Sequence, residues 1–212
     1  MRTNTLLLIA GLMVVGCKNP GAEVAPAKVE PATDSKAEAA PTGEPDEASS
    51  GSLAINPSNS KIEFVGAKVT ASHDGGFTQF SGKVDLGDPI EASSIELTIQ
   101  TESLFADKEK LTKHLKSPDF FDVAKFPTAT FRSTEIKKDG EGHTISGDLT
   151  LHGVTKRISF PATVSVTDSQ VNANAEFSIN RQDFGIAYAG MKDDLIRDLV
   201  VIKLSLNLPR QS

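Results

Sequence analysis

The chain has 212 residues, a formal net charge of −6, one Cys, no Trp, one Tyr and eleven Phe. No run of Lys or Arg exceeds two residues, so the charge pattern excludes the basic footprint of a nucleic-acid-binding protein. A single Cys excludes an intrachain disulfide and a Cys-based metal cluster. All aromatic residues lie between Phe64 and Tyr188, which places the core downstream of the first segment.

The N-terminus carries an export signal. Arg2 precedes an apolar run from Leu6 to Val15, which matches a signal h-region and falls short of the ~20 residues of a spanning helix. The run ends in the residues VVGC, with small residues before the scissile bond and the thiol of Cys17 after it, which resembles the bacterial lipobox. Residues 1–16 are therefore predicted to be a lipoprotein signal peptide. An ordinary signal peptide with an incidental Cys is the alternative.

The lipobox resemblance implies that Cys17 is diacylated and becomes the lipid-attached mature N-terminus. More than one acyl chain exceeds the limit of marginal attachment, so the anchor is expected to be permanent. The residue after the Cys is Lys18 rather than Asp, and Asp at this position would act as a retention signal. In Gram-negative sorting, this resembles a signal for the outer membrane. We expect a cell-envelope protein, on the outer membrane facing the periplasm if the host is Gram-negative.

Residues 17–52 are predicted to be the acylated Cys and a disordered tether. The segment is rich in Ala, Pro and Glu, and Val24 and Val29 are its only larger apolar residues. Such a composition buries too little surface to offset the entropy of ordering. As a coil it would hold the domain several nanometres from the bilayer. A peptidoglycan-binding or partner-binding arm is the alternative.

Residues 53–212 show the period of two that is typical of strands with one buried face. The clearest case is the last strand, where Val200, Ile202 and Leu204 alternate with polar residues. Eight strands are predicted: around 61–64, around 77–80, and at 95–100, 129–136, 144–151, 158–166, 171–179 and 200–208.

One helix is expected from Asp107 to Ser117, where Leu111 and Leu115 lie four residues apart in a long loop, and a helical turn is expected between Asp193 and Asp198. The chain has no βαβ alternation, which leaves antiparallel folds. Long, evenly spaced strands favour a closed barrel over a sandwich, and an eight-stranded barrel is wide enough for one small ligand.

Five segments of this domain resemble the YceI family. They are HDGGFTQFSG (73–82), HLKSPDFFD (114–122), FPTATF (126–131), GDLTLHGVTK (147–156) and NRQDFGI (180–186). The resemblance covers about residues 53–208 in the family's order. It implies a lipocalin-like antiparallel barrel that holds an extended isoprenoid chain in an apolar bore, and export to the periplasm. Together with the strand pattern, this predicts an all-β, eight-stranded, lipocalin-like barrel. The lipobox and tether depart from the family's soluble members and argue against a freely diffusing carrier.

The candidates for lining the barrel interior are apolar and mostly aromatic. They are Phe64, Phe77, Phe80, Ile95, Leu97, Phe131, Phe160, Phe177, Ile179, Leu204 and Leu206, with Phe120, Phe121, Phe126 and Phe184 closer to the loops and rim. For each residue alone, core packing is the competing interpretation.

Polar residues that could hold a lipid headgroup lie in or near the family-like runs. They are His73, Lys113, His114, Asp119, Arg181 and Asp183. Asp119 could instead cap a turn, and Arg181 could simply pair with Asp183. A metal site made from His73, His114 and His152 lacks the usual ligand spacing, so no metal and no cofactor besides a bound lipid are expected.

No motif indicates an enzyme: there is no G-x-S-x-G, no phosphate loop and no H-E-x-x-H. We expect a membrane-anchored, non-enzymatic protein that binds a long isoprenoid lipid, namely a polyprenol, polyprenyl phosphate or isoprenoid quinone. The alternative is an envelope interaction or stress-response protein whose barrel is filled by its own side chains. A lipid hydrolase would additionally require a nucleophile and a base that converge in the interior.

Overall fold

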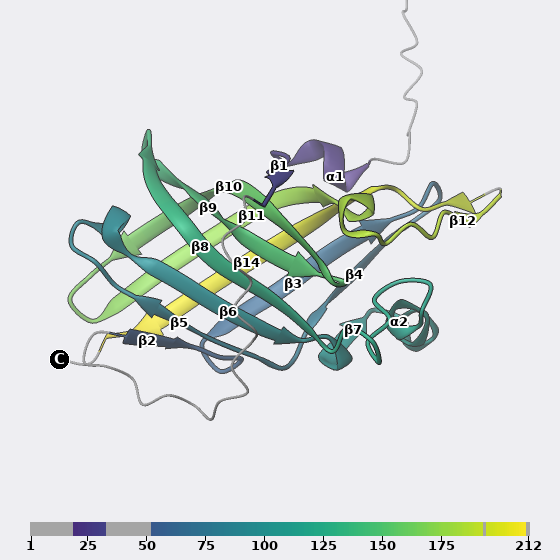
Figure 1. The fold of residues 1–212 in the computed structure, drawn as a ribbon, viewed down its shortest axis with the longest axis horizontal. Helices are drawn as coiled ribbons and strands as arrows, with labels where there is room; N and C mark the ends of the chain where they lie inside the picture. Colours follow the sequence, from purple (N-terminus) through teal and green to yellow (C-terminus); the bar gives the residue numbers. More distant parts are fainter. Residues whose placement is uncertain (1–18, 33–51, 193, 211–212) are drawn as a thin grey trace, which may run out of the picture.

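The computed structural model describes residues 19–32, 52–192 and 194–210. Most of this chain forms one curled antiparallel sheet, with a short helix and a small hairpin at one end (Figure 1). Among the described residues, no helix has the length and apolar character needed to cross a membrane. The predicted signal peptide and Cys17 lie outside the described residues.

The main sheet has twelve strands. In chain order they are β1 (Lys28–Pro31), β2 (Ser52–Ile55), β3 (Ser60–Ala67), β4 (Ser72–Phe77), β5 (Phe80–Asp85), β6 (Ser94–Gln100), β7 (Leu104–Ala106), β8 (Thr128–Asp139), β9 (Gly142–Leu151), β10 (Val154–Val166), β11 (Gln170–Asn180) and β14 (Leu199–Pro209). The order across the sheet is β2-β5-β6-β8-β9-β10-β11-β14-β3-β4-β7, and β1 pairs with β10.

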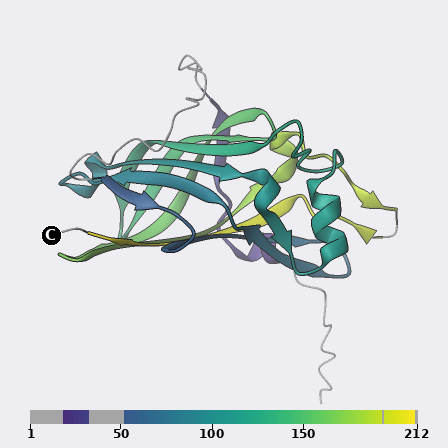
Figure 2. The same cartoon turned by 90° about the horizontal axis from the view of Figure 1, so that it is seen from below.

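The remaining elements are short. They are the helices α1 (Pro20–Glu23) and α2 (Glu109–Lys116), the 3-10 turns η1 (Ile90–Ala92), η2 (Thr101–Ser103) and η3 (Arg181–Phe184), and the separate strand pair β12 (Gly190–Met191) and β13 (Asp194–Leu195). Helix α2 confirms the helix expected near residues 107–117. In Figure 2 it lies at the same end of the sheet as the β12–β13 pair.

The all-β, antiparallel, lipocalin-like class is confirmed, but the strand count and the closure differ from the prediction. The segment expected as one strand around 77–80 is a corner: β4 ends at Phe77 and β5 begins at Phe80. Within the described ranges the ladder runs from β2 to β7 without returning to β2, so the sheet is a curled half-barrel. Strands as short as β2 and β7 carry too few residues for a clear alternation.

The helical turn expected between Asp193 and Asp198 is also wrong, because Asp194–Leu195 form strand β13. Contacts distant in sequence hold this segment extended. The backbone N–H of Val69 donates to the carbonyl of Leu195 at 3.0 Å, and Lys68 pairs with Asp194. A hydrogen bond from Lys68 lowers the pKa of the Asp194 carboxyl, and burial opposes this shift. Tertiary contacts therefore override the local preference.

Residues 19–31, hereafter the strap, are ordered on the outside of the sheet, so the prediction of a disordered tether is wrong for this part. Helix α1 contacts β3, β11 and β14, and β1 forms a ladder with β10. Small side chains let the strap approach closely: a Cβ added to Gly21 would lie 2.5 Å from the Cβ of Leu199. Residues 33–51 of the predicted tether lie outside the described residues.

Candidate functional site

The inner face of the curled sheet surrounds a cavity of about 220 Å³, hereafter the bore. Alternation along each strand places apolar side chains inside. Strand β14 shows this most clearly, because Val200, Ile202, Leu204 and Leu206 all line the bore. Six residue steps at ~3.3 Å give this lined stretch a length of about 20 Å, so the bore is long and narrow.

The two ends of the bore differ. Beyond Leu206, the register partners Leu208 and Val171 are buried at 0% and 3% exposure and close that end with packed side chains. At the opposite end, helix α2 and the loop after it contribute Leu115, Phe120 and Phe121 to the lining. The second end is therefore covered by a helix and a loop rather than by strands (Figure 2).

Most of the predicted lining residues face the bore. They are Phe64, Phe77, Ile95, Leu97, Phe120, Phe121, Phe131, Phe160, Phe177, Ile179, Leu204 and Leu206. The sequence interpretation missed several aliphatic lining residues, including Ile62, Leu115, Ile145, Leu149, Leu151 and Ile158. Strand alternation could have found those of β9, since Ile145, Leu149 and Leu151 share one face. Contact of any lining residue with a lipid stays a prediction.

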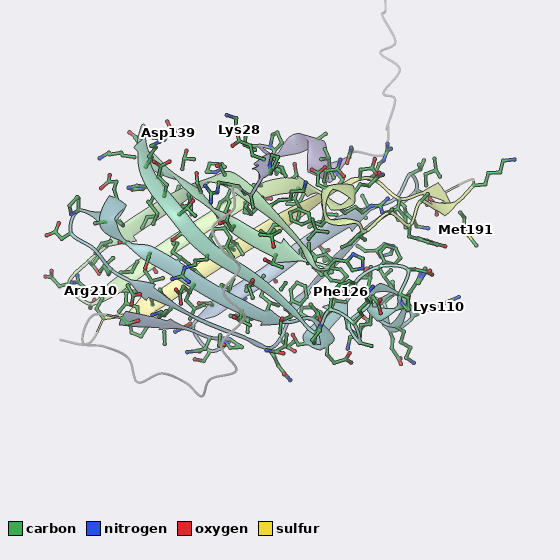
Figure 3. The ribbon with its side chains drawn as sticks, viewed as in Figure 1. Lys28, Lys110, Phe126, Asp139, Met191 and Arg210 are labelled. Carbon is green, nitrogen blue, oxygen red and sulfur yellow. The ribbon has the colours of Figure 1, made fainter. Side chains whose placement is uncertain are left out.

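Three predicted lining residues do not face the bore. Phe80 begins β5 at the corner of the sheet and is buried in the core beside the bore. Phe184 is fully buried in η3. Phe126 (Figure 3) packs on His152, with ring centroids 4.4 Å apart, and the Nζ of Lys125 lies 5.0 Å from the centroid of the Phe126 ring. The position of a Phe in the sequence does not show whether its ring lines the bore, packs in the core or lies at the rim, because aromatic rings are buried in all three places.

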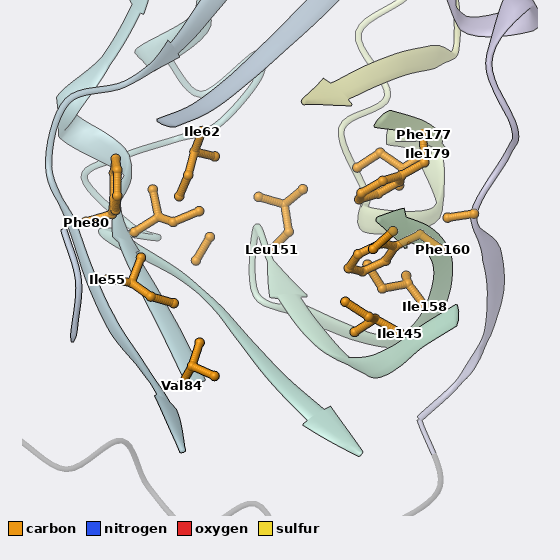
Figure 4. Packing of buried hydrophobic residues seen from close by; sticks show 14 of the residues in the cluster. Ile55, Ile62, Phe80, Val84, Ile145, Leu151, Ile158, Phe160, Phe177 and Ile179 are labelled. Atoms are coloured by element: carbon orange, nitrogen blue, oxygen red, sulfur yellow. The ribbon is translucent and has the colours of Figure 1, made fainter. Parts of the chain in front are cut away.

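Aromatic rings meet across the bore wall. Phe160 of β10 and Phe177 of β11 are stacked, with centroids 4.2 Å apart and an interplanar angle of 12° (Figure 4). Toward the α2 end, Phe77 contacts both Phe64 and Phe121 at centroid distances of 6.1 and 6.0 Å. These rings give the bore an apolar surface that offers dispersion contacts but few hydrogen bonds.

Arg181 is the one cation that lines the bore among the described residues, and its donors are used by its own chain. Its guanidinium donates to the carbonyls of Ile186 at 2.6 Å and Arg197 at 3.1 Å, and to the Oδ1 of Asp198 at 3.1 Å. Burial lowers the pKa of Arg181, and Asp198 opposes that shift. The suggested pairing with Asp183 is wrong, because Asp183 is exposed and the ionic partner is Asp198.

The other headgroup candidates lie near the α2 end in separate pairs. The Nε2 of His114 is 3.0 Å from the Oδ2 of Asp119, and the imidazole also contacts Phe120 and Tyr188 at 5.0 and 5.1 Å between centroids. His73 pairs with Asp107 at 3.0 Å. The exposed Lys113 pairs with Glu109 at 2.8 Å on the surface of α2.

The three histidines considered for a metal site do not meet. The Nδ1 of His152 lies 3.2 Å from the carbonyl of Phe184, while His73 and His114 each contact a different carboxylate. Across the part of the chain that the structure describes, no group of three or more His, Cys, Asp or Glu side chains could hold a metal ion.

A curled antiparallel sheet around a lengthwise apolar bore defines a lipocalin-like binding protein. A family model described as a YceI-like domain matches residues 53–208. The chain therefore belongs to the YceI family.

Two curated relatives illustrate the sequence similarity. A UPF0312 protein of Pseudomonas putida (strain W619) is 40% identical over 124 residues, which cover 55% of this chain and 62% of that protein. A UPF0312 protein of Enterobacter sp. (strain 638) is 46% identical over 89 residues, covering 42% of this chain and 46% of the relative. The match thus spans less than two thirds of the length of either relative.

Solved structures show the same fold at low identity. Burkholderia cenocepacia BcnA superposes with a TM-score of 0.64 at 24% identity, covering 70% of this chain and 95% of that one. A domain from Saccharophagus degradans, described as a polyisoprenoid binding domain implicated in plant cell wall breakdown, gives a TM-score of 0.62 at 17% identity, covering 77% and 100%. At this identity the similarity establishes the fold alone.

Proposed function

We propose that this protein binds an extended isoprenoid lipid in the bore and is held to a membrane of the cell envelope through acylated Cys17. The lipid would be a polyprenol, a polyprenyl phosphate or an isoprenoid quinone. The protein acts by binding rather than by catalysis. No cofactor besides the lipid takes part.

The observation that carries this proposal is the apolar bore itself. Its lining combines aliphatic side chains with the Phe rings of several strands, and polar side chains are few. An engineered apolar cavity of ~150 Å³ already binds a benzene ring, and this bore of about 220 Å³ is larger. Each buried CH₂ group of a ligand contributes up to ~0.8 kcal/mol, so an apolar chain needs no polar partner along its length.

The headgroup is best accommodated at the α2 end. That end has polar side chains within reach of the bore, since His114 contacts both Asp119 and the bore-lining Phe120. The opposite end is closed by Leu208 and Val171, which offer no hydrogen-bonding side chains. Lys113 points away on an exposed helix surface and contributes to the headgroup only at longer range.

The test is native mass spectrometry with lipid extraction on the exported, acylated chain. The chain is purified in a detergent that is free of isoprenoids, so that any isoprenoid in the extract comes from the host. We expect a stoichiometric isoprenoid in the extract and a protein mass that shows acylated Cys17. A chain that carries no lipid and takes up no added polyprenol or quinone would refute the carrier function. The envelope interaction protein would then be the better explanation.

A bore-filling variant links the lipid to the bore. A Cβ added to Gly66 meets nothing within 4 Å, and Gly66 lines the bore, so Gly66→Leu places a side chain in open space. We expect this variant to fold and to lose most of the bound lipid. Gly66→Ala is the matched control and should retain it. Equal lipid content in both variants would place the ligand elsewhere.

A further inference from the structure

The wall of the bore has a gap between β10 and β11, hereafter the seam. The two strands pair only from Thr163↔Asn174 to Val166↔Val171. Beyond these four pairs, each strand pairs with its neighbour on the other side. Strand β10 pairs with β9 from Val154 to Ala162, and β11 pairs with β14 as far as Asn180. Over this stretch β10 and β11 therefore separate, and neither supplies backbone hydrogen bonds to the other.

The strap fills the seam as an inserted strand. Strand β1 pairs antiparallel with residues 156–159 of β10. On the other side, the backbone N–H of Ala27 donates to the carbonyl of Ser178 at 2.8 Å, and the N–H of Ser178 donates to the carbonyl of Ala25 at 3.0 Å. The wall of the bore is thus completed here by a segment that precedes the matched family domain.

The bore lies directly behind the strap. Ile158 and Phe160 of β10 and Phe177 and Ile179 of β11 flank the seam, and all four line the bore. Figure 4 shows β1 passing outside these side chains. On the inner side, the seam is bridged by the stacked rings of Phe160 and Phe177 rather than by backbone pairing.

A second cavity opens at the point where β10 and β11 diverge. It has a volume of about 560 Å³ and a partly polar lining. Four residues, Ala162, Asn174, Ala175 and Leu204, line both this outer cavity and the bore. The wall between solvent and bore is therefore only one side chain thick at this end of the seam.

The strap is held by small side chains and few hydrogen bonds. Its buried apolar contacts come mainly from Ala27 and Val29, and Pro26 and Pro31 have no N–H to donate. Segments with few buried apolar contacts and a short ladder are the first to open in a folded protein. The seam can therefore open while the long strands on either side remain paired.

We infer that the seam, closed by the strap, is the side opening through which an extended apolar lipid passes between the membrane and the bore. This inference rests on the proposed function. Asn19 is two positions after Cys17, so at most about 7 Å of extended chain lies between the acylated residue and the start of the strap. The anchor would therefore hold the strap, and with it the seam, close to the membrane surface.

A cross-link across the seam tests the inference. Lys28 and Ser159 are register partners on β1 and β10, at a Cα spacing that suits a disulfide. The mature chain with Cys17→Ser, which keeps the strap, carries Lys28→Cys and Ser159→Cys. The probe is all-trans-retinol, a fluorescent isoprenoid alcohol, and the rise of its fluorescence in stopped flow reports loading of the bore.

We expect the oxidised double variant to load at least about tenfold more slowly than the reduced one, with the same final amount bound. The single variants Lys28→Cys and Ser159→Cys should load at the parent rate in both conditions. Equal rates for the oxidised and reduced double variant would overturn the side opening and leave lipid binding intact. If the parent chain itself binds no retinol or added polyprenol, the proposed function fails, and the inference fails with it.

A loosened strap gives the opposite result. Gly21→Leu forces α1 away from Leu199, whose Cβ would lie 2.5 Å from the added Cβ. Ala22→Leu adds a similar side chain at an exposed position of the same helix and is the control. We expect faster loading for Gly21→Leu and an unchanged rate for Ala22→Leu. Unchanged loading in Gly21→Leu, with the strap shown to be displaced by its faster hydrogen exchange, would contradict the inference.

Discussion

The two sides of β11 differ in how they are held. Along β14, all 11 residues of β11 have a register partner, from Gln170↔Pro209 to Asn180↔Leu199. Along β10, only the four pairs at the start of β11 exist, and the strap supplies the rest of the wall. One sheet therefore combines a firm side, built from long alternating strands, with a side completed by a short segment of small residues.

The largest effect should come from Arg181, which follows β11 and fastens the firm side. Arg181→Met leaves the carbonyls of Ile186, Ile196 and Arg197 without this donor in a buried setting. We expect the free energy of unfolding to fall by about 3 kcal/mol or more, measured by urea denaturation. Arg197→Met, which leaves the Arg181 side chain in place, is the comparison variant, and an equally large loss there would show that the effect is not specific to Arg181.

A pair of core truncations compares the two sides directly. Leu208 on the firm side is 0% exposed, and Leu208→Ala should lower the free energy of unfolding by about 2–5 kcal/mol. Val29 of the strap is only partly buried, so Val29→Ala should cost about 1 kcal/mol or less. Both values come from denaturant titrations. Similar losses for the two variants would show that the strap is as firmly packed as the long strands.

The smallest effect should come from the exposed face of the strap. Lys28 lies on the outside of the molecule (Figure 3). Its side chain is 80% exposed, and its Nζ lies 3.8 Å from the Oε1 of Glu30. Such a pair contributes little, so Lys28→Ala should change the free energy of unfolding by no more than about 0.5 kcal/mol. A loss above about 1 kcal/mol would mean that the ion pair, rather than the backbone ladder, holds the strap.

Alternation along the chain was sufficient to predict the antiparallel class and most of the bore. In β14, each second residue from Val200 to Leu206 faces inward, as a period of two requires. The α2 helix was also predictable, because its pattern is local. These features depend on residues close together in sequence, which is the range over which pattern reasoning works.

The features that were not predicted depend on distant partners. The strap has the composition of a disordered segment, and it is ordered because the seam, more than a hundred residues away in the chain, leaves backbone groups of β10 and Ser178 to pair with. Likewise, the ionic partner of Arg181 is Asp198 rather than the nearby Asp183, since the turn after β11 lies against the start of β14. Composition and local spacing carry no information on such pairings.

The position of Tyr188 has an optical consequence. It is the single Tyr of a chain without Trp, and its ring contacts His114 and the bore-lining Phe120 at 5.1 and 5.2 Å between centroids. Light absorbed near 280 nm therefore excites one phenol, at the α2 end, against a background of weakly absorbing Phe rings. Its emission and near-ultraviolet circular dichroism give a label-free signal from the α2 end of the bore, while a label placed on the strap would report on the seam independently.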